Sequence, residues 1–228
     1  MRAKEHDDAV PIPPERALDN ALDRVWPLIQ QLTGPRTDAP KTKVVSDDDL
    51  LLGRIVERFC QGLDTRRSTQ WFDILMFSVG PDHAAPLCDL CWRAGRMSLA
   101  TLRSVILNVW AAHEFAEARL GRRRWLGLFT ASGFVADPAR EAPGAPIEVW
   151  RGASPRRMRG MAWTTELSIA EDFASRTNWL GGDAVVFHAT IPADAVLAML
   201  DRPDGLHSET VIVRPDALRG RASPSAGQ

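Results

Sequence analysis

The spacing of apolar residues changes near Pro143, and this change constrains the fold more than any other feature of the sequence. Upstream of it, apolar residues recur every three or four positions, as in the stretches 15–32 and 98–110, which is the period of an amphipathic helix. Downstream come short runs that are rich in β-branched residues or bounded by proline and glycine, which is typical of strands: 146–152, 184–191, 195–200 and 209–213. The sequence therefore predicts an α+β fold in which helices precede a strand-rich core.

The same change of pattern divides the chain into four predicted parts. They are an N-terminal extension with one helix and a linker, a helical layer, a strand-rich core and a tail that we expect to be disordered, at residues 1–44, 45–140, 141–218 and 219–228. Both ends are rich in small, charged and proline residues and have little apolar surface to bury. Within the core, Ser168 and Glu171 form a capping-box pattern, which predicts that a helix begins there.

Composition excludes several classes of protein. Of 228 residues, 45% are hydrophobic and 25% charged, and 28 Lys and Arg stand against 29 Asp and Glu, which argues against a general polyanion binder. No apolar run reaches the roughly 18 residues that a bilayer span needs. The beginning, MRAKEHDDAVPIPPER, carries acids and prolines where a signal peptide needs an apolar run. We expect a cytoplasmic protein, or one delivered to a target cytoplasm, with no membrane partner.

The cysteines bear on metal binding and on disulfide formation. Cys88 and Cys91 have the spacing of zinc ligands, but no second CxxC or HxxxH pair completes a set of four. The helical pattern around them predicts that both side chains belong to the core, so we expect no metal site. Three cysteines also cannot all pair within one chain, which argues against a disulfide framework.

Two arginine clusters lie in the second half of the chain, Arg119 with Arg122 to Arg124, and Arg156 and Arg157 with Arg159. Such clusters can bind phosphates, but solvated helix ends look the same in a sequence. No aromatic residues are interleaved with them as in nucleic-acid-binding modules, so nucleic acid is a possible partner that the sequence does not favour. Neither a GxSxG motif nor a phosphate-binding P-loop is present.

Three polar features remain, and they occur in a fixed order. Arg151 closes the predicted strand at 146–152, a polar turn follows at 160–165, and Glu209 begins the last predicted strand. Each feature alone is weak, because an arginine at a strand end is usually a surface or ion-pair residue. Their order and their flanking residues are more informative.

Residues of roughly 125–218 resemble an ADP-ribosyltransferase domain of the Arg–Ser–Glu class, which includes bacterial mono-ADP-ribosylating toxins and related phage proteins. The matching segments are WLGLFTASGFV, IEVWRGA, RGMAWTTELSIAEDFA and HSETVIVRPDAL. The resemblance implies a split, two-sheet β core that holds NAD, with the N-terminal helices as a flanking layer.

The resemblance assigns roles to individual residues. Arg151 takes the place of the family arginine, Thr164 falls in the Ser-x-Ser/Thr element, and Glu209 falls on the catalytic glutamate. The first serine of that element is Ala162 here, which lacks a hydroxyl. A carboxylate at Glu209 would stabilise positive charge on the nicotinamide ribose, and an arginine fork would suit pyrophosphate or ribose oxygens. Thr164 would brace Glu209 or the ribose through its hydroxyl.

Four further residues follow from the same comparison. Gly152 would allow close approach of the nicotinamide carboxamide, and Trp163 and Phe173 would pack beside the nicotinamide or belong to the core. His207 replaces the Glu or Gln that many relatives have two positions before the glutamate, and it would meet the acceptor.

The implied function is transfer of ADP-ribose from NAD to a macromolecular acceptor, expected to be a protein, with release of nicotinamide and without a metal. Two alternatives stay open on the same residues. One is an NAD glycohydrolase, in which water replaces the acceptor. The other is a non-catalytic module that binds NAD or nucleic acid, for which Ala162 is the suggestive feature.

Overall fold

The chain divides into two compact units, Met1–Ser98 and Leu99–Gln228. The structure is a computed structural model, and it describes residues 14–34, 47–65, 69–113, 115–201, 209–219 and 223–224. The division falls inside the range 45–140, which the sequence predicts as one helical layer. The helices after Ser98 belong instead with the sheet, because their apolar faces contact its strands, as described below.

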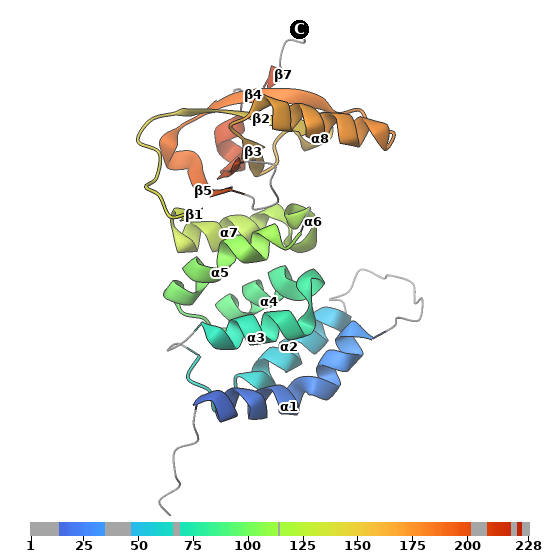
Figure 1. The fold of residues 1–228 in the computed structure, drawn as a ribbon, viewed down its shortest axis with the longest axis vertical. Coiled ribbons are helices and arrows are strands. Elements are labelled where there is room, and N and C mark those ends of the chain that lie inside the picture. Colours follow the sequence, from blue (N-terminus) through green and yellow to red (C-terminus); the bar gives the residue numbers. More distant parts are fainter. Residues whose placement is uncertain are drawn as a thin grey trace, which may run out of the picture. The chain divides into compact units, whose positions relative to one another are not determined.

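The first unit is helical throughout its described ranges (Figure 1). Its helices are α1 (Pro14–Thr33), α2 (Asp47–Phe59), α3 (Gln70–Val79) and α4 (Pro81–Arg93). Helix α1 packs on α2 and α3, and α4 packs on both of these. The residues at helical spacing are the buried ones, among them Ile29, Ile55 and Leu75. Apolar periodicity therefore locates these helices. No helix in the described ranges is both long and apolar enough to cross a membrane.

The three cysteines, Cys60, Cys88 and Cys91, are free and buried in the first unit. The predicted core position of Cys88 and Cys91 is therefore confirmed. Within the described part of the chain, no group of three or more His, Cys, Asp or Glu residues could hold a metal ion. Burial raises the pKa of the Cys60 thiol to about 11 and that of Cys88 to about 12, and it raises the pKa of Cys91 well above its ordinary value.

These thiols should resist alkylation in the native protein. A thiol whose pKa is raised stays protonated at pH 8, and the protonated form is not the nucleophile. We expect iodoacetamide at pH 8 to label none of the three cysteines over the minutes in which it labels all three in denaturant, as counted by intact mass. Fast labelling of Cys88 in the folded protein would contradict the buried placement.

The second unit combines helices with one sheet (Figure 1). Its helices are α5 (Leu99–Ala111), α6 (Ala116–Leu120), α7 (Arg122–Ser132) and α8 (Leu167–Trp179). Helix α5 packs on α7, α5 contacts strand β1 (Val135–Asp137), and α7 contacts strand β5 (Val196–Asp201). Helix α7 ends at Ser132, because Gly133 takes the positive φ of 68° at its C-terminal end.

The remaining strands are β2 (Ile147–Ala153), β3 (Ala162–Thr164), β4 (Val185–Ile191), β6 (Glu209–Val213) and β7 (Ser223–Pro224). Three short 3-10 turns, η1 (Pro155–Arg157), η2 (Ala193–Ala195) and η3 (Pro215–Leu218), connect them. The strand order is β1-β5-β6-β3-β2-β4-β7, with β1 and β5 parallel and every other pair antiparallel.

All the described strands belong to this one sheet, where a split two-sheet core was expected. Strands β1, β5, β6 and β3 form one half of the sheet, and β2, β4 and β7 form the other. The two halves meet between β2 and β3, which are paired at a single residue pair, Trp150 opposite Thr164. By contrast, β2 pairs with β4 over seven positions, from Ile147 to Ala153. The sheet is therefore continuous, but its narrowest join lies between the strands that carry the predicted site.

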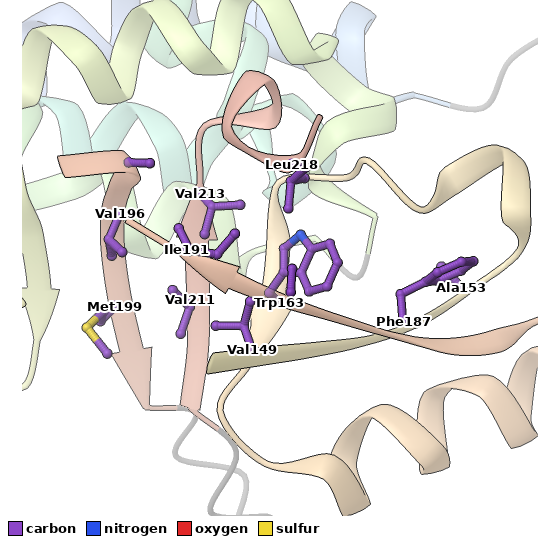
Figure 2. Packing of buried hydrophobic residues seen from close by; sticks show 12 residues of the cluster. Val149, Ala153, Trp163, Phe187, Ile191, Val196, Met199, Val211, Val213 and Leu218 are labelled. Atoms are coloured by element: carbon purple, nitrogen blue, oxygen red, sulfur yellow. The ribbon is translucent and has the colours of Figure 1, made fainter. Parts of the chain in front are cut away.

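One face of the sheet carries an apolar cluster from β2, β3, β4, β5 and β6 (Figure 2). Val149, Trp163, Phe187 and Val211 are among its members, and each is at most 3% exposed. Helix α8 packs on the other face at β2, because Gly152 faces α8 while its neighbour Ala153 belongs to the cluster. Neighbouring residues of a strand point to opposite faces of the sheet, so this alternation decides on which face each site residue lies.

Helix α8 begins one residue before the predicted capping box. Its N-cap is Glu166, and no side chain caps it, so Ser168 lies inside the helix. The turn before α8 is instead held by Thr164, whose hydroxyl oxygen accepts a hydrogen bond from the Glu166 backbone N–H at 3.1 Å. Thr164, which is not part of the capping-box pattern, therefore takes the role that was predicted for Ser168.

Candidate functional site

The three segments predicted to form the site lie on neighbouring strands. Strand β6 with Glu209 pairs with β3, and β3 pairs with β2, which carries Arg151. These segments are far apart in the sequence, and hydrogen bonding of the strands brings them together. The predicted grouping of Arg151, Thr164 and Glu209 is thus found at the level of strands, but the side chains make different contacts from those expected.

Glu209 begins β6, and both oxygens of its carboxylate have a partner. Oε2 accepts a hydrogen bond from Thr165 Oγ1 at 2.9 Å, and Oε1 accepts one from Arg140 Nη1. The Glu209 side chain is 17% exposed, so most of it is removed from water. This fixed, partly desolvated carboxylate is the strongest chemical feature of the site.

Thr165, rather than Thr164, braces the glutamate. Thr164, the last residue of β3, is opposite Thr210, so Thr165 comes directly after the strand at the level of Glu209. Thr164 points to the other face, where its hydroxyl holds the start of α8. The predicted bracing of Glu209 by Thr164 is therefore wrong, because alternation along the strand gives that contact to its neighbour.

Arg140 is the partner that sequence reasoning missed. Its Nη2 donates to Asp201 Oδ1 at 2.7 Å while Nη1 donates to Glu209, so one guanidinium joins two carboxylates on β5 and β6. Asp201 and Glu209 are register partners, which explains why one fork reaches both. Burial acts to lower the pKa of Arg140, but the hydrogen bond to Asp201 and the charges of both carboxylates outweigh it and raise that pKa. Arg140 lies in a connection without secondary structure, where no periodic pattern marks it.

Arg151 makes no contact with Glu209. Its Nε donates to the Arg157 carbonyl at 3.2 Å and its Nη1 donates to the Ala162 carbonyl. Burial lowers the pKa of Arg151, and the charge of Glu117 opposes this shift while those of Arg122 and Arg157 add to it. The guanidinium therefore ties β2 to the segment that leads into β3.

Two small residues make room for that guanidinium. A Cβ at Gly160 would lie 2.3 Å from Arg151 Nη2, so a larger residue there would displace the guanidinium from this position. Ala162 contributes its backbone carbonyl, which needs no side-chain hydroxyl. The alanine in place of serine is thus compatible with this contact.

The remaining predicted ligand residues are placed as follows. Gly152 does permit a close approach, but to α8: a Cβ there would lie 2.1 Å from the Ala170 carbonyl oxygen. Trp163 is 3% exposed in the apolar cluster, and its Nε1 donates to the Gly160 carbonyl at 2.8 Å, so it is a core residue (Figure 2). Phe173 is exposed on α8, with Arg176 over its ring at 4.4 Å. His207 lies outside the described residues.

Comparisons with family models, with curated proteins and with solved structures find no match for this chain.

Proposed function

We propose that this protein is a mono-ADP-ribosyltransferase that moves ADP-ribose from NAD to a macromolecular acceptor. The observation that carries the proposal is the Glu209 carboxylate, held by Thr165 and Arg140 at the start of β6, beside the β3 and β2 strands that carry the other predicted elements. The narrow join between β2 and β3 is compatible with the two-part core of that family.

The chemistry asks little of the protein beyond positioning and charge. The bond between the nicotinamide nitrogen and ribose C1′ breaks, nicotinamide leaves as a neutral molecule, and an acceptor atom bonds to C1′ as its proton is lost. Glu209 would stabilise the positive charge that develops on the ribose, as carboxylates do in glycoside cleavage. No general acid is needed for this leaving group.

The residues present fit these demands in defined ways. Thr165 would keep the carboxylate in one rotamer, because its hydroxyl donates to Oε2. Arg151 would act mainly as a positioning residue that holds β3 against β2, with its remaining N–H donors left for phosphate oxygens. His207 would act toward the acceptor, two positions before Glu209 in the sequence.

A first test asks whether NAD is consumed catalytically. With cell extract as the source of acceptor, the full chain should release many equivalents of nicotinamide per protein molecule, which chromatography of the quenched reaction quantifies. Release of less than one equivalent over hours, with NAD present at millimolar concentration, would contradict the proposal.

The contact of Arg140 favours a second candidate function, a fold that binds NAD without turning it over. A guanidinium on Glu209 partly neutralises the charge that the reaction needs. On this reading Arg140 keeps the site inactive, and NAD binding would leave nicotinamide in place.

Replacing Arg140 by alanine separates the two functions. For an active transferase, we expect nicotinamide release to rise by about fivefold, because a positive charge near the ribose is removed and about 1 kcal/mol at the transition state has this effect. Arg140→Lys is the matched control, since it keeps the charge and should leave the rate near that of the wild type. A rate that falls in Arg140→Ala would contradict the assigned effect. Turnover by Arg140→Ala with none by the wild type would support a site that Arg140 keeps inactive, and zero turnover in both would contradict that role of Arg140 as well as the transferase function.

A further inference from the structure

Helix α7 begins with three arginines, Arg122, Arg123 and Arg124, and has no acidic residue in its first turn. This is the reverse of the usual preference, because the helix dipole places partial positive charge at the N-terminus and favours acidic residues there. No side chain caps this end of α7, whose N-cap is Gly121. The arrangement costs folding stability and favours an anion at this position.

The same end of α7 lines a pocket of about 560 Å³ within the second unit. Five arginines line it: Arg122, Arg123, Arg159, Arg214 and Arg219. The only acidic residue among its lining residues is Asp216. A volume of this size is in the range of pockets that hold small ligands.

Much of this positive charge has no acidic partner. Arg122 pairs with Glu117 at 3.0 Å, and Arg214 pairs with Asp194 at 3.2 Å. Among the described residues, Arg123, Arg159 and Arg219 have no carboxylate within ion-pair distance.

One donor at the pocket is also unsatisfied. Nε of Arg214 is buried and has no hydrogen-bond partner, although Asp216 Oδ1 lies 4.0 Å away. Buried donors of folded proteins are normally satisfied, so an unpaired one is a signal of a missing acceptor.

We infer that this pocket binds a small ligand with two or more adjacent phosphate groups, of which a nucleoside di- or triphosphate fits the volume. Guanidinium groups bind phosphate oxygens with paired, charge-assisted hydrogen bonds, and several of them converge here. Leu126 and Pro215 also line the pocket and offer apolar contact to a base.

The pocket lies apart from Glu209, the residue proposed to act on the nicotinamide ribose, although the charge of its lining residue Arg122 also acts on Arg151. Arg214 follows the last residue of β6, Val213, whereas Glu209 is the first residue of that strand. Four residue steps along a strand span about 13 Å. The inference therefore does not depend on the proposed transferase function.

Calorimetric titration of the full chain with inorganic pyrophosphate, ADP and adenosine tests the inference. We expect pyrophosphate and ADP to bind and adenosine not to bind. Arg123→Ala and Arg159→Ala should each weaken ADP by about tenfold or more, as loss of a charge-assisted hydrogen bond does. Arg156→Ala, an exposed arginine that does not line the pocket, is the matched control and should leave the affinity unchanged.

A second variant distinguishes a ligand site from an ordinary charged surface. Arg123→Glu should raise the melting temperature of the ligand-free protein, because an acid at the first turn of α7 suits the helix dipole, and it should abolish ADP binding. Glu209→Gln should bind ADP as the wild type does, which keeps this result apart from the transferase assignment. Absence of pyrophosphate and ADP binding by the wild type, equal affinity in Arg156→Ala and Arg159→Ala, or binding only of a 12-nucleotide single-stranded RNA would each overturn the inference.

Discussion

Replacing Glu209 by glutamine should reduce nicotinamide release from NAD by 100-fold or more while the protein stays folded. Loss of one preorganised electrostatic group commonly has an effect of about 10² or more on a rate. Glutamine has the same shape and can still accept the hydrogen bond from Thr165. The ion pair with Arg140 is lost, but that side chain is 32% exposed, so the cost in stability should be about 1 kcal/mol or less.

Asp201→Asn is the matched control for this substitution. It also changes a carboxylate to an amide beside Arg140, on the neighbouring strand, at a side chain that is 51% exposed. We expect its rate to change by no more than about threefold, because the group is solvated and is not assigned to the ribose. Circular dichroism shows whether both variants are folded, and nicotinamide release gives the rate of each. A folded Glu209→Gln protein with the wild-type rate would remove Glu209 from the reaction.

Gly152→Ala should destabilise the second unit by about 2–4 kcal/mol, because overpacking against fixed backbone is costly. The added Cβ would lie 2.1 Å from the Ala170 carbonyl oxygen and 2.5 Å from the Ala174 nitrogen. Both atoms belong to the backbone of α8, so the helix itself must move away from β2. Urea unfolding followed by tryptophan fluorescence gives the change in the free energy of unfolding.

Gly127→Ala is the control for this measurement. Gly127 lies inside α7 in the same unit, and a Cβ there would meet nothing within 4 Å. Alanine in a helix interior is favoured over glycine by about 1 kcal/mol, so this variant should be slightly more stable than the wild type. An unchanged midpoint for Gly152→Ala would show that α8 does not pack on β2 as described.

The sequence located elements wherever burial has a regular period. Residues 209–213 and 184–191 lie close to the strands β6 and β4, because β-branched residues between turn signals leave few other choices. The short strands β1 and β7 were missed, since two or three residues show no period. The boundary between the two units, after Ser98, was not predicted. It depends on which surfaces α5 and α7 contact, whereas periodicity shows only that each helix has an apolar face.

The sequence predicted which strands carry the candidate site, but not which side chains contact one another there. Glu209 was found because it begins a strand in a recognisable order of motifs. Which threonine contacts Glu209, Thr164 or Thr165, depends on the register between β3 and β6. The sequence around β3 does not determine that register. Arg140 and the tight fit at Gly152 depend on where a loop and a helix run in space, and neither path leaves a local pattern in the sequence.

Incubation of the protein with NAD labelled in the adenylate portion, in the presence of cell extract, tests the transferase assignment most directly. Nicotinamide release and macromolecule-bound label are followed in the same samples, with Glu209→Gln as the inactive reference. The assignment predicts that both products accumulate together in the wild type and that neither does so in Glu209→Gln. Nicotinamide release with all the label in free ADP-ribose would contradict transfer and indicate a glycohydrolase, and no release of nicotinamide would contradict catalysis altogether.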